Sequence, residues 1–213
     1  MLFSALTVLP FSASAMYDDS SPKSEYEVKP PVGLTLVYNG KEQIGVLTGE
    51  DSNYVNYYGY DVINYKATNA GTYTATAVLW GDFGPQTFVW TDGTIADKKI
   101  TFVIKKAPNT LNVKGKTAVL KLAKLKKKNQ TLALKKAVSV SNAQGKASYK
   151  LVSAKKGNKS FIKKFAINSK TGKITVKKGT KKGTYKVKIK VSAAGNANYE
   201  KASKMTTATI KVK

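Results

Sequence analysis

Lysine and apolar residues alternate through most of residues 181–191, KKGTYKVKIKV, and this period of two restricts the fold more than any other feature of the chain. Successive side chains of a β-strand point to opposite faces, so the pattern predicts a strand with one apolar and one basic face. The residues expected toward a core are Tyr185, Val187, Ile189 and Val191, and those expected toward water are Lys186, Lys188 and Lys190. A solvated sheet face is enough to explain such a strand, and exposed lysines also discourage pairing between sheet edges.

The same period of two recurs along the chain, without a helical stripe. Examples are GTYTATAVLW at residues 71–80, ASYKLVS at 147–153 and TTATIKVK at 206–213. Turn residues separate these segments, and Asn39-Gly40 after LTLVY is a strong hairpin signal because both residues tolerate a positive φ. Many short strands between turns predict an all-β sandwich or barrel.

Charge divides the chain into two halves. Residues 1–104 hold six lysines and eleven acidic residues, a net charge of −5, whereas residues 105–213 hold 31 lysines and only Glu200, a net charge of +30. The change falls at KKAPN, residues 105–109, where a proline ends a strand pattern. GTYTATAVL in the first half and GTYKVKIKV in the second form an internal echo, so we expect two modules of one architecture.

The chain begins with an apolar stretch, MLFSALTVLPFSASA, which ends in the small-x-small pattern of a secretory cleavage site. We therefore expect a secreted or cell-surface protein. The expected divisions are a signal-peptide remnant at 1–15, a flexible lead-in at 16–29, an acidic domain at 30–106 and a lysine-rich domain at 107–213. No other segment reaches the ~20 apolar residues of a spanning helix, so we expect no membrane span after signal removal.

Composition excludes several kinds of site. The chain contains no cysteine, no histidine and no arginine. That removes disulfides, thiolate nucleophiles, imidazole bases and the usual zinc ligands, and we expect neither a metal nor another cofactor. Lysine is a mobile point charge rather than the rigid fork that reads guanine edges, so we expect no sequence-specific binding of nucleic acid.

Several motifs resemble known families. The motifs YNGKEQ, NAGTYTATAVL and KITFVIKKA are similar to the bacterial Ig-like repeats of the MBG type, over about residues 30 to 107. GKASYKL, FAINSKTGKITV and GTYKVKIKVSAAGNANY resemble a second bacterial Ig-like or cadherin-like module. The resemblance implies two tandem Ig-like antiparallel β-sandwich domains that act as a spacer or adhesion module without catalysis. Cadherins bind calcium between domains through clustered acids, and a module with Glu200 alone lacks the carboxylates for that.

The lysine-rich half predicts a long-range positive potential that attracts polyanions. The lysines expected to make such contacts are Lys126, Lys127, Lys128, Lys177, Lys178, Lys181, Lys182, Lys186, Lys188 and Lys190. The expected partners are anionic cell-wall polymers such as teichoic acids, extracellular DNA bound without sequence preference, or acidic glycans. The competing interpretation is a spacer whose charge only confers solubility. The sequence leaves these two open, together with the oligomeric state.

Aromatic residues of the first half give an alternative, a carbohydrate-binding module, because a ring face stacks on the apolar face of a pyranose. The candidate residues are Tyr54, Tyr57, Tyr58, Trp80 and Trp90. The competing interpretation is that the tryptophans pack the sandwich and the tyrosines cover its open end. Catalysis has less support: the best acidic pair, Glu50-Asp51, consists of neighbours that would point to opposite faces of a strand. We therefore expect no enzyme.

Overall fold

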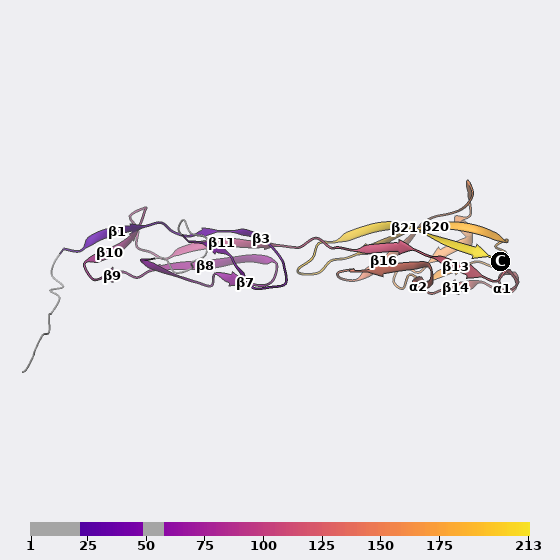
Figure 1. Cartoon of the computed structure of the whole chain (residues 1–213), viewed down its shortest axis with the longest axis horizontal. Coiled ribbons are helices and arrows are strands. Elements are labelled where there is room, and N and C mark those ends of the chain that lie inside the picture. Colours follow the sequence, from indigo (N-terminus) through magenta and orange to yellow (C-terminus); the bar gives the residue numbers. More distant parts are fainter. Residues whose placement is uncertain (1–21, 49–57) are drawn as a thin grey trace, which may run out of the picture.

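The chain forms an elongated pair of β-sandwiches placed end to end, in a computed structural model that describes residues 22–48 and 58–213 (Figure 1). One short connection joins the two domains, and the C-terminus lies at the far end of the second domain (Figure 1). The first apolar core ends at Ile104 and the second begins at Leu111, so the two cores share no residue.

The first domain consists of short strands in two main sheets. The strands are β1 (Ser24–Val28), β2 (Val32–Gly33), β3 (Thr35–Val37), β4 (Gln43–Ile44), β5 (Val46–Leu47), β6 (Tyr60–Ile63), β7 (Lys66–Ala67), β8 (Gly71–Leu79), β9 (Asp82–Phe83), β10 (Gln86–Trp90) and β11 (Lys98–Lys105). One sheet has the order β3-β11-β8-β6 and another the order β1-β10-β9, while β2 pairs with β5 and β4 with β7. The pairs β3–β11 and β1–β10 are parallel, and the others are antiparallel.

The second domain has longer strands and three helical turns. The elements are β12 (Asn112–Gly115), β13 (Thr117–Leu120), α1 (Leu122–Lys127), β14 (Gln130–Leu132), α2 (Leu134–Ala137), β15 (Val138–Ser141), β16 (Ala147–Lys156), β17 (Lys159–Ser160), η1 (Ile162–Lys164), β18 (Phe165–Ile167), β19 (Ile174–Val176), β20 (Gly183–Ala193) and β21 (Ala202–Val212). A five-stranded sheet, β13-β21-β20-β16-β17, is accompanied by the sheet β14-β19-β18 and the pair β12–β15.

Both domains share one plan. In each, the final strand pairs in parallel with a short early strand and antiparallel with the long strand before it. The two GTY sequences begin the equivalent strands β8 and β20. The hydroxyl of Tyr73 donates to the carbonyl oxygen of Asn69, and that of Tyr185 donates to the carbonyl oxygen of Lys181. Both hydrogen bonds are 2.8 Å long, and each acceptor lies four residues before its tyrosine. Such a tyrosine corner is a hallmark of Ig-like sandwiches. The expected fold class, two tandem Ig-like β-sandwich domains, is confirmed.

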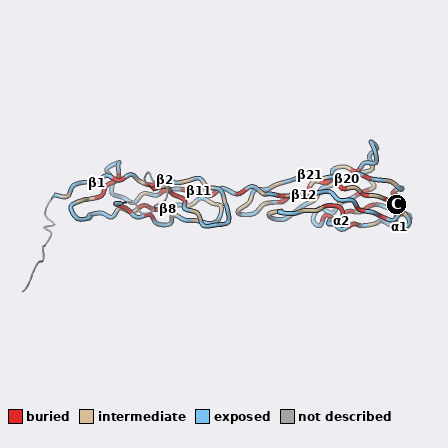
Figure 2. Tube along the Cα trace, viewed as in Figure 1, coloured by how far each residue is buried: buried red, intermediate tan, exposed pale blue. Residues whose placement is uncertain are grey.

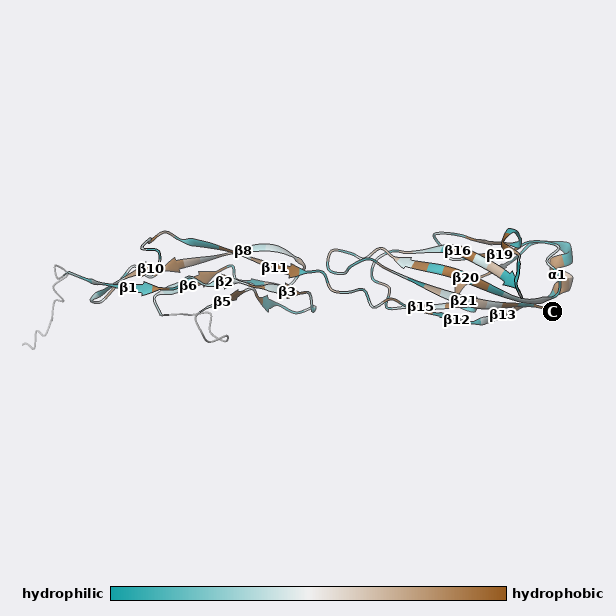
Figure 3. Cartoon of the chain, turned by 90° about the horizontal axis from the view of Figure 1, so that it is seen from above, coloured by the Kyte–Doolittle hydropathy of each residue, from teal (hydrophilic) through white to brown (hydrophobic). Residues whose placement is uncertain are grey.

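Each domain has its own buried core (Figure 2). The four residues of β20 expected toward the core, from Tyr185 to Val191, are all 0% exposed, while Lys186 and Lys188 are exposed and Lys190 is partly exposed. Figure 3 shows this alternation of hydropathy along β20. Burying each large apolar side chain contributes about 1.5–3 kcal/mol, so the alternation predicted from the sequence fixes both the strand and its orientation.

The flexible lead-in expected at 16–29 is wrong for its last part. Ser24–Val28 forms β1, which pairs in register with β10 from Ser24 opposite Gln86 to Val28 opposite Trp90. Val28 is 2% exposed and belongs to the first core. The sequence of β1 shows no apolar alternation, because pairing with the backbone of β10 and one buried residue, Val28, hold the strand in place. The expected signal remnant at 1–15 lies outside the described residues.

Two further expectations about local structure need correction. The turn at Asn39-Gly40 forms, with Gly40 at φ 82° and the Lys41 N–H donating to Asn39 Oδ1, but it does not make a hairpin. Strand β3 pairs with β11 and β4 with β7, because the chain crosses here between sheets. Helical turns also occur where none was expected. In the parts of the chain that the structure describes, no helix is long and apolar enough to cross a membrane.

Candidate functional site

The outer face of the five-stranded sheet carries a ladder of lysines. Lys186, Lys188 and Lys190 project from the central strand β20, as predicted. On β16, Lys150 lies directly opposite Lys190, and Lys155 directly opposite Lys186. We call these five residues the lysine ladder. The sequence did not reveal Lys150 and Lys155 as members, because the register that places them opposite β20 includes an irregularity between Leu151 and Ser153.

Hydroxyl groups flank the ladder on the same face. Ser192 of β20 is paired with Ser148 on one side and Ser203 on the other. On β21, Thr209 lies opposite Lys186 and its Oγ1 accepts a hydrogen bond of 2.9 Å from Lys186 Nζ. The face therefore offers ammonium groups and hydroxyl donors side by side, both of which bind the oxygens of phosphates, sulfates or carboxylates.

A second group of lysines gathers at the free end of the second domain. This distal cluster comprises Lys126, Lys127, Lys128, Lys177, Lys178, Lys181 and Lys182. Helix α1 brings the first three to the others, since the carbonyl oxygen of its buried Leu125 accepts from the Gly179 N–H at 3.0 Å. The Lys178 N–H also donates to Asn129 Oδ1 at 2.8 Å. An open concavity of about 230 Å³ between them is lined in part by Lys126, Lys181 and Lys182.

The charge of the second domain is uncompensated. Residues 105–213, all of which the structure describes, form no ion pair between side chains. In the first domain, ion pairs among the described residues include those of Lys23 with Asp82, Lys98 with Asp92 and, at a longer distance, Lys66 with Glu42. Residues 107–213 hold 29 lysines and one acid, so the second domain carries a strong positive charge that attracts anions over a long range.

Two carboxylates of the first domain, those of Asp82 and Asp92, have close structural partners. Asp92 accepts from Lys98 Nζ at 2.6 Å and from the side chain and backbone of Thr94, and the Lys98 hydrogen bond most strongly holds its pKa well below the ordinary 3.8. The hydrogen bond from Lys23 likewise lowers the pKa of Asp82. Within residues 22–48 and 58–213, no three carboxylates gather as a metal site would require. The pair Glu50-Asp51 lies outside the described residues.

An exposed aromatic cluster lies at the end of the first domain that carries β1, β9 and β10 (Figure 1). Its rings are those of Tyr26, Tyr58, Trp80 and Phe83, which are 39–55% exposed. The first three contact the buried Phe88, whereas Phe83 contacts Tyr58 and Trp80. The Tyr58 ring lies 5.1 Å from Phe88, 5.7 Å from Trp80 and 5.7 Å from Tyr26. Its hydroxyl donates to Gln86 Oε1 at 3.0 Å.

This cluster changes which residues of the first domain are candidates for binding a carbohydrate. Tyr58 and Trp80 lie together and are accessible. Trp90 is 0% exposed and its Nε1–H donates to the Ala96 carbonyl oxygen, so the expected sugar contact does not hold for this residue. Tyr54 and Tyr57 lie outside the described residues. The sequence alone does not indicate Tyr26, which lies in the expected lead-in, or Phe83, which lies between Gly81 and Gly84.

A loop of the second domain contacts the end of the first. The Ala107 N–H donates to the Asn198 carbonyl oxygen, and the Glu200 N–H to the Ala107 carbonyl oxygen, both at 2.9 Å. Asn198 Oδ1 accepts from the Ala70 N–H at 2.8 Å, and the rings of Tyr38 and Tyr199 meet at 5.3 Å. Backbone, amide and ring contacts therefore link the two domains beside the connecting segment.

No family model matches the chain, and no curated protein matches its sequence. Solved structures with a similar fold include protocadherin gammaB7 domains EC3–6 (12% identity over 85% of this chain and 48% of that chain, TM-score 0.40). Others are Drosophila N-cadherin EC1–4 (10%, 87% and 48%, TM-score 0.35) and human protocadherin-24 EC1–2 (9%, 89% and 95%, TM-score 0.37). The chain spans about half the length of the first two. Cadherin-like structures are thus among those it is similar to, whereas no MBG-type family is identified. At these identities and TM-scores the likeness carries no information on ligands or partners.

Proposed function

We propose that the chain is a non-catalytic, secreted or cell-surface spacer and adhesion element that attaches ionically to anionic polymers through its lysine-rich domain. The uncompensated charge of residues 105–213 carries this proposal, because no side-chain ion pair there neutralises any of the 31 lysines. A positive surface of this density accumulates polyanions and releases their counterions on contact.

The elongated shape supports the role of a spacer. The two sandwiches lie end to end and the loop around Asn198 fixes their junction, so the lysine-rich end is held away from the N-terminal end (Figure 1). The distal cluster occupies the outermost part of the second domain. This arrangement presents the charge to a polymer while the first domain stays clear of it.

Retention on an immobilised anionic polymer tests the proposal. The full chain should be held at about 50 mM salt and released at about 200 mM, because each lysine–anion contact displaces a counterion. A neutral polymer is the control matrix, and lysine acetylation, which removes the charge, should abolish retention on the anionic one. Retention that does not change between the two salt concentrations would contradict ionic attachment.

The exposed aromatic cluster favours a second candidate function, carbohydrate binding by the first domain. Four accessible rings, three of which contact the buried Phe88, form a dense apolar surface of a kind that often marks a binding site. Because Trp90 is buried, a glycan should change the fluorescence of Trp80 alone, and Trp80→Phe should remove the response. If a broad set of glycans left the fluorescence unaltered, the first domain would have no such role.

A further inference from the structure

We propose that the outer face of the five-stranded sheet is a track for a linear polyol phosphate polymer of the teichoic acid type. This inference rests on the proposed ionic attachment and names its partner and its main contact surface. The track consists of the lysine ladder together with the flanking hydroxyls of Ser148, Ser192, Ser203, Thr207 and Thr209.

The ladder places like charges where they cost stability. Lys150 opposes Lys190 and Lys155 opposes Lys186 across neighbouring strands, and directly opposed like charges destabilise a sheet. A coat that only confers solubility can place its charges in turns and at chain ends, as the distal cluster does. A phosphate lying between two opposed ammonium groups would remove their repulsion and add charge-assisted hydrogen bonds.

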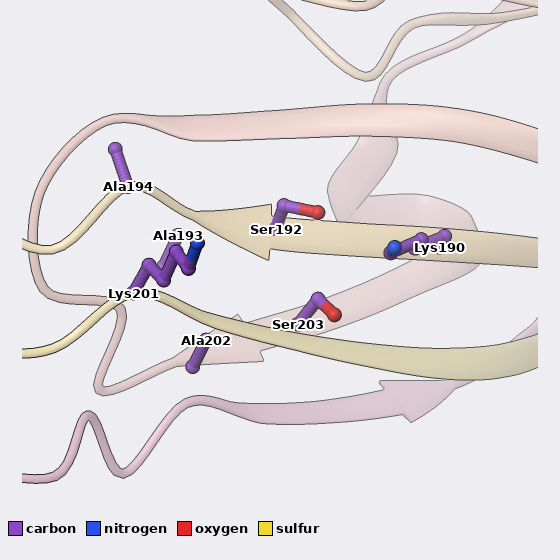
Figure 4. Close-up of a pocket in the computed structure, with 7 residues that line it drawn as sticks. All are labelled: Lys190, Ser192, Ala193, Ala194, Lys201, Ala202 and Ser203. Carbon is purple, nitrogen blue, oxygen red and sulfur yellow. The ribbon is translucent and has the colours of Figure 1, made fainter.

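The spacing of the ladder matches a repeating anion. Alternate residues of a strand are about 6.6–6.8 Å apart on one face, so the three lysines of β20 repeat at that interval. This is comparable with the separation of successive phosphates in an extended phosphodiester chain. At the junction end, the track opens into a concavity of about 510 Å³ lined by Lys190, Ser192, Lys201 and Ser203 with three alanines (Figure 4).

The residues that the face lacks argue against polymers that are held by stacking on aromatic rings. The paired residues on this face of β16, β20 and β21 are lysines, serines and threonines with one methionine, Met205, and include no aromatic residue and no acid. The exposed Val152 lies beside them at the irregularity of β16. Single-stranded nucleic acids need exposed rings on which their bases stack, and pyranose polymers also favour ring platforms. A polyol phosphate offers only phosphates and hydroxyls, and these are the groups that ammonium and hydroxyl side chains bind.

Two charge-matched triple variants of the full chain test the track. K186Q/K188Q/K190Q removes three charges from the ladder, and K126Q/K127Q/K128Q removes three from exposed positions of the distal cluster. The probe is immobilised poly(glycerol phosphate), with binding measured across a salt series. The ladder variant should lose at least about tenfold more affinity than the control, and the slope of log affinity against log salt should fall by about two.

Other outcomes of this experiment would overturn the track, the ionic attachment or the assigned polymer. Equal losses in both variants would overturn the track but leave ionic attachment intact, whereas a wild-type chain that no polyanion retains at low salt would overturn both. Tighter, ladder-dependent binding to single-stranded DNA or to heparin than to poly(glycerol phosphate) would overturn the assigned polymer. Should the triple variant fail to fold, Lys188→Gln compared with Lys127→Gln makes the same comparison with one charge.

Discussion

Removing the hydroxyl of Tyr185 should destabilise the second domain and leave the first unaffected. This side chain is 0% exposed, and its hydroxyl donates to the Lys181 carbonyl oxygen at 2.8 Å. In Tyr185→Phe the ring still packs against Phe161 and Phe165, at 5.3 and 5.4 Å, so little packing is lost. The loss is one net hydrogen bond plus a carbonyl left unpaired, which lowers the free energy of unfolding by about 1–3 kcal/mol.

Calorimetry can assign that loss to one domain. For a domain of about 100 residues, each kcal/mol shifts the thermal midpoint by roughly 4–8 °C. The control is Tyr149→Phe in the same domain, because the half-buried Tyr149 makes no hydroxyl hydrogen bond to another described residue. Tyr73→Phe should shift the other transition. If Tyr185→Phe moves the midpoint no more than Tyr149→Phe, the corner does not stabilise the domain in the way argued.

Three further predictions concern acid stability and the junction. The second domain has Glu200 as its one acidic side chain, so its thermal midpoint should barely change from neutral pH to about pH 2. Unfolding of this domain in acid would contradict that prediction. The first domain should lose stability as the pH falls below 3.8, because the lowered pKa of Asp92 means that its carboxylate stabilises the fold above that pH. Asp92→Asn should weaken this acid dependence, measured as thermal midpoints across a pH series. An unchanged dependence in the variant would contradict the role of Asp92. Asn198→Ala removes the side-chain acceptor of the Ala70 N–H, so small-angle scattering should show a wider range of interdomain distances at nearly constant midpoints; scattering identical to wild type would refute the role of this amide.

The sequence predicts the fold wherever alternation and burial coincide. Strand β20 was placed, with its faces, from KKGTYKVKIKV alone, because the apolar residues of one parity must be buried together. The failures occur where backbone pairing decides the structure. Strand β1 has one core residue, Val28, and depends on its partner β10. Strand β3, which precedes the turn at Asn39-Gly40, pairs with β11 instead of with β4. Such pairings join residues far apart in the sequence.

The same limit applies to the candidate site. The sequence identifies the lysine runs and, by alternation, three members of the ladder. It does not show that helix α1 brings Lys126, Lys127 and Lys128 to the other runs of the distal cluster. It does not show that Lys150 opposes Lys190, because the irregularity at Leu151 shifts the register of β16. Nor does it show that Tyr26 and Phe83 meet Tyr58, since Tyr26 lies in the expected lead-in and all three residues are far apart in the sequence.

The two domains relate folding to partner binding in different ways. In the second domain, the apolar residues of β20 lie on its buried face and the lysines on its exposed face. Lys186 or Lys188 can therefore be replaced without changing a buried contact. In the first domain, the exposed rings of Tyr58 and Trp80 also pack on buried Phe88, so a substitution there changes the surface and the core together. Binding at the lysine ladder should therefore be separable from stability by mutation, whereas binding at the aromatic cluster should not. The difference arises because the exposed side chains of β20 make no core contacts, whereas the exposed rings of the first domain do.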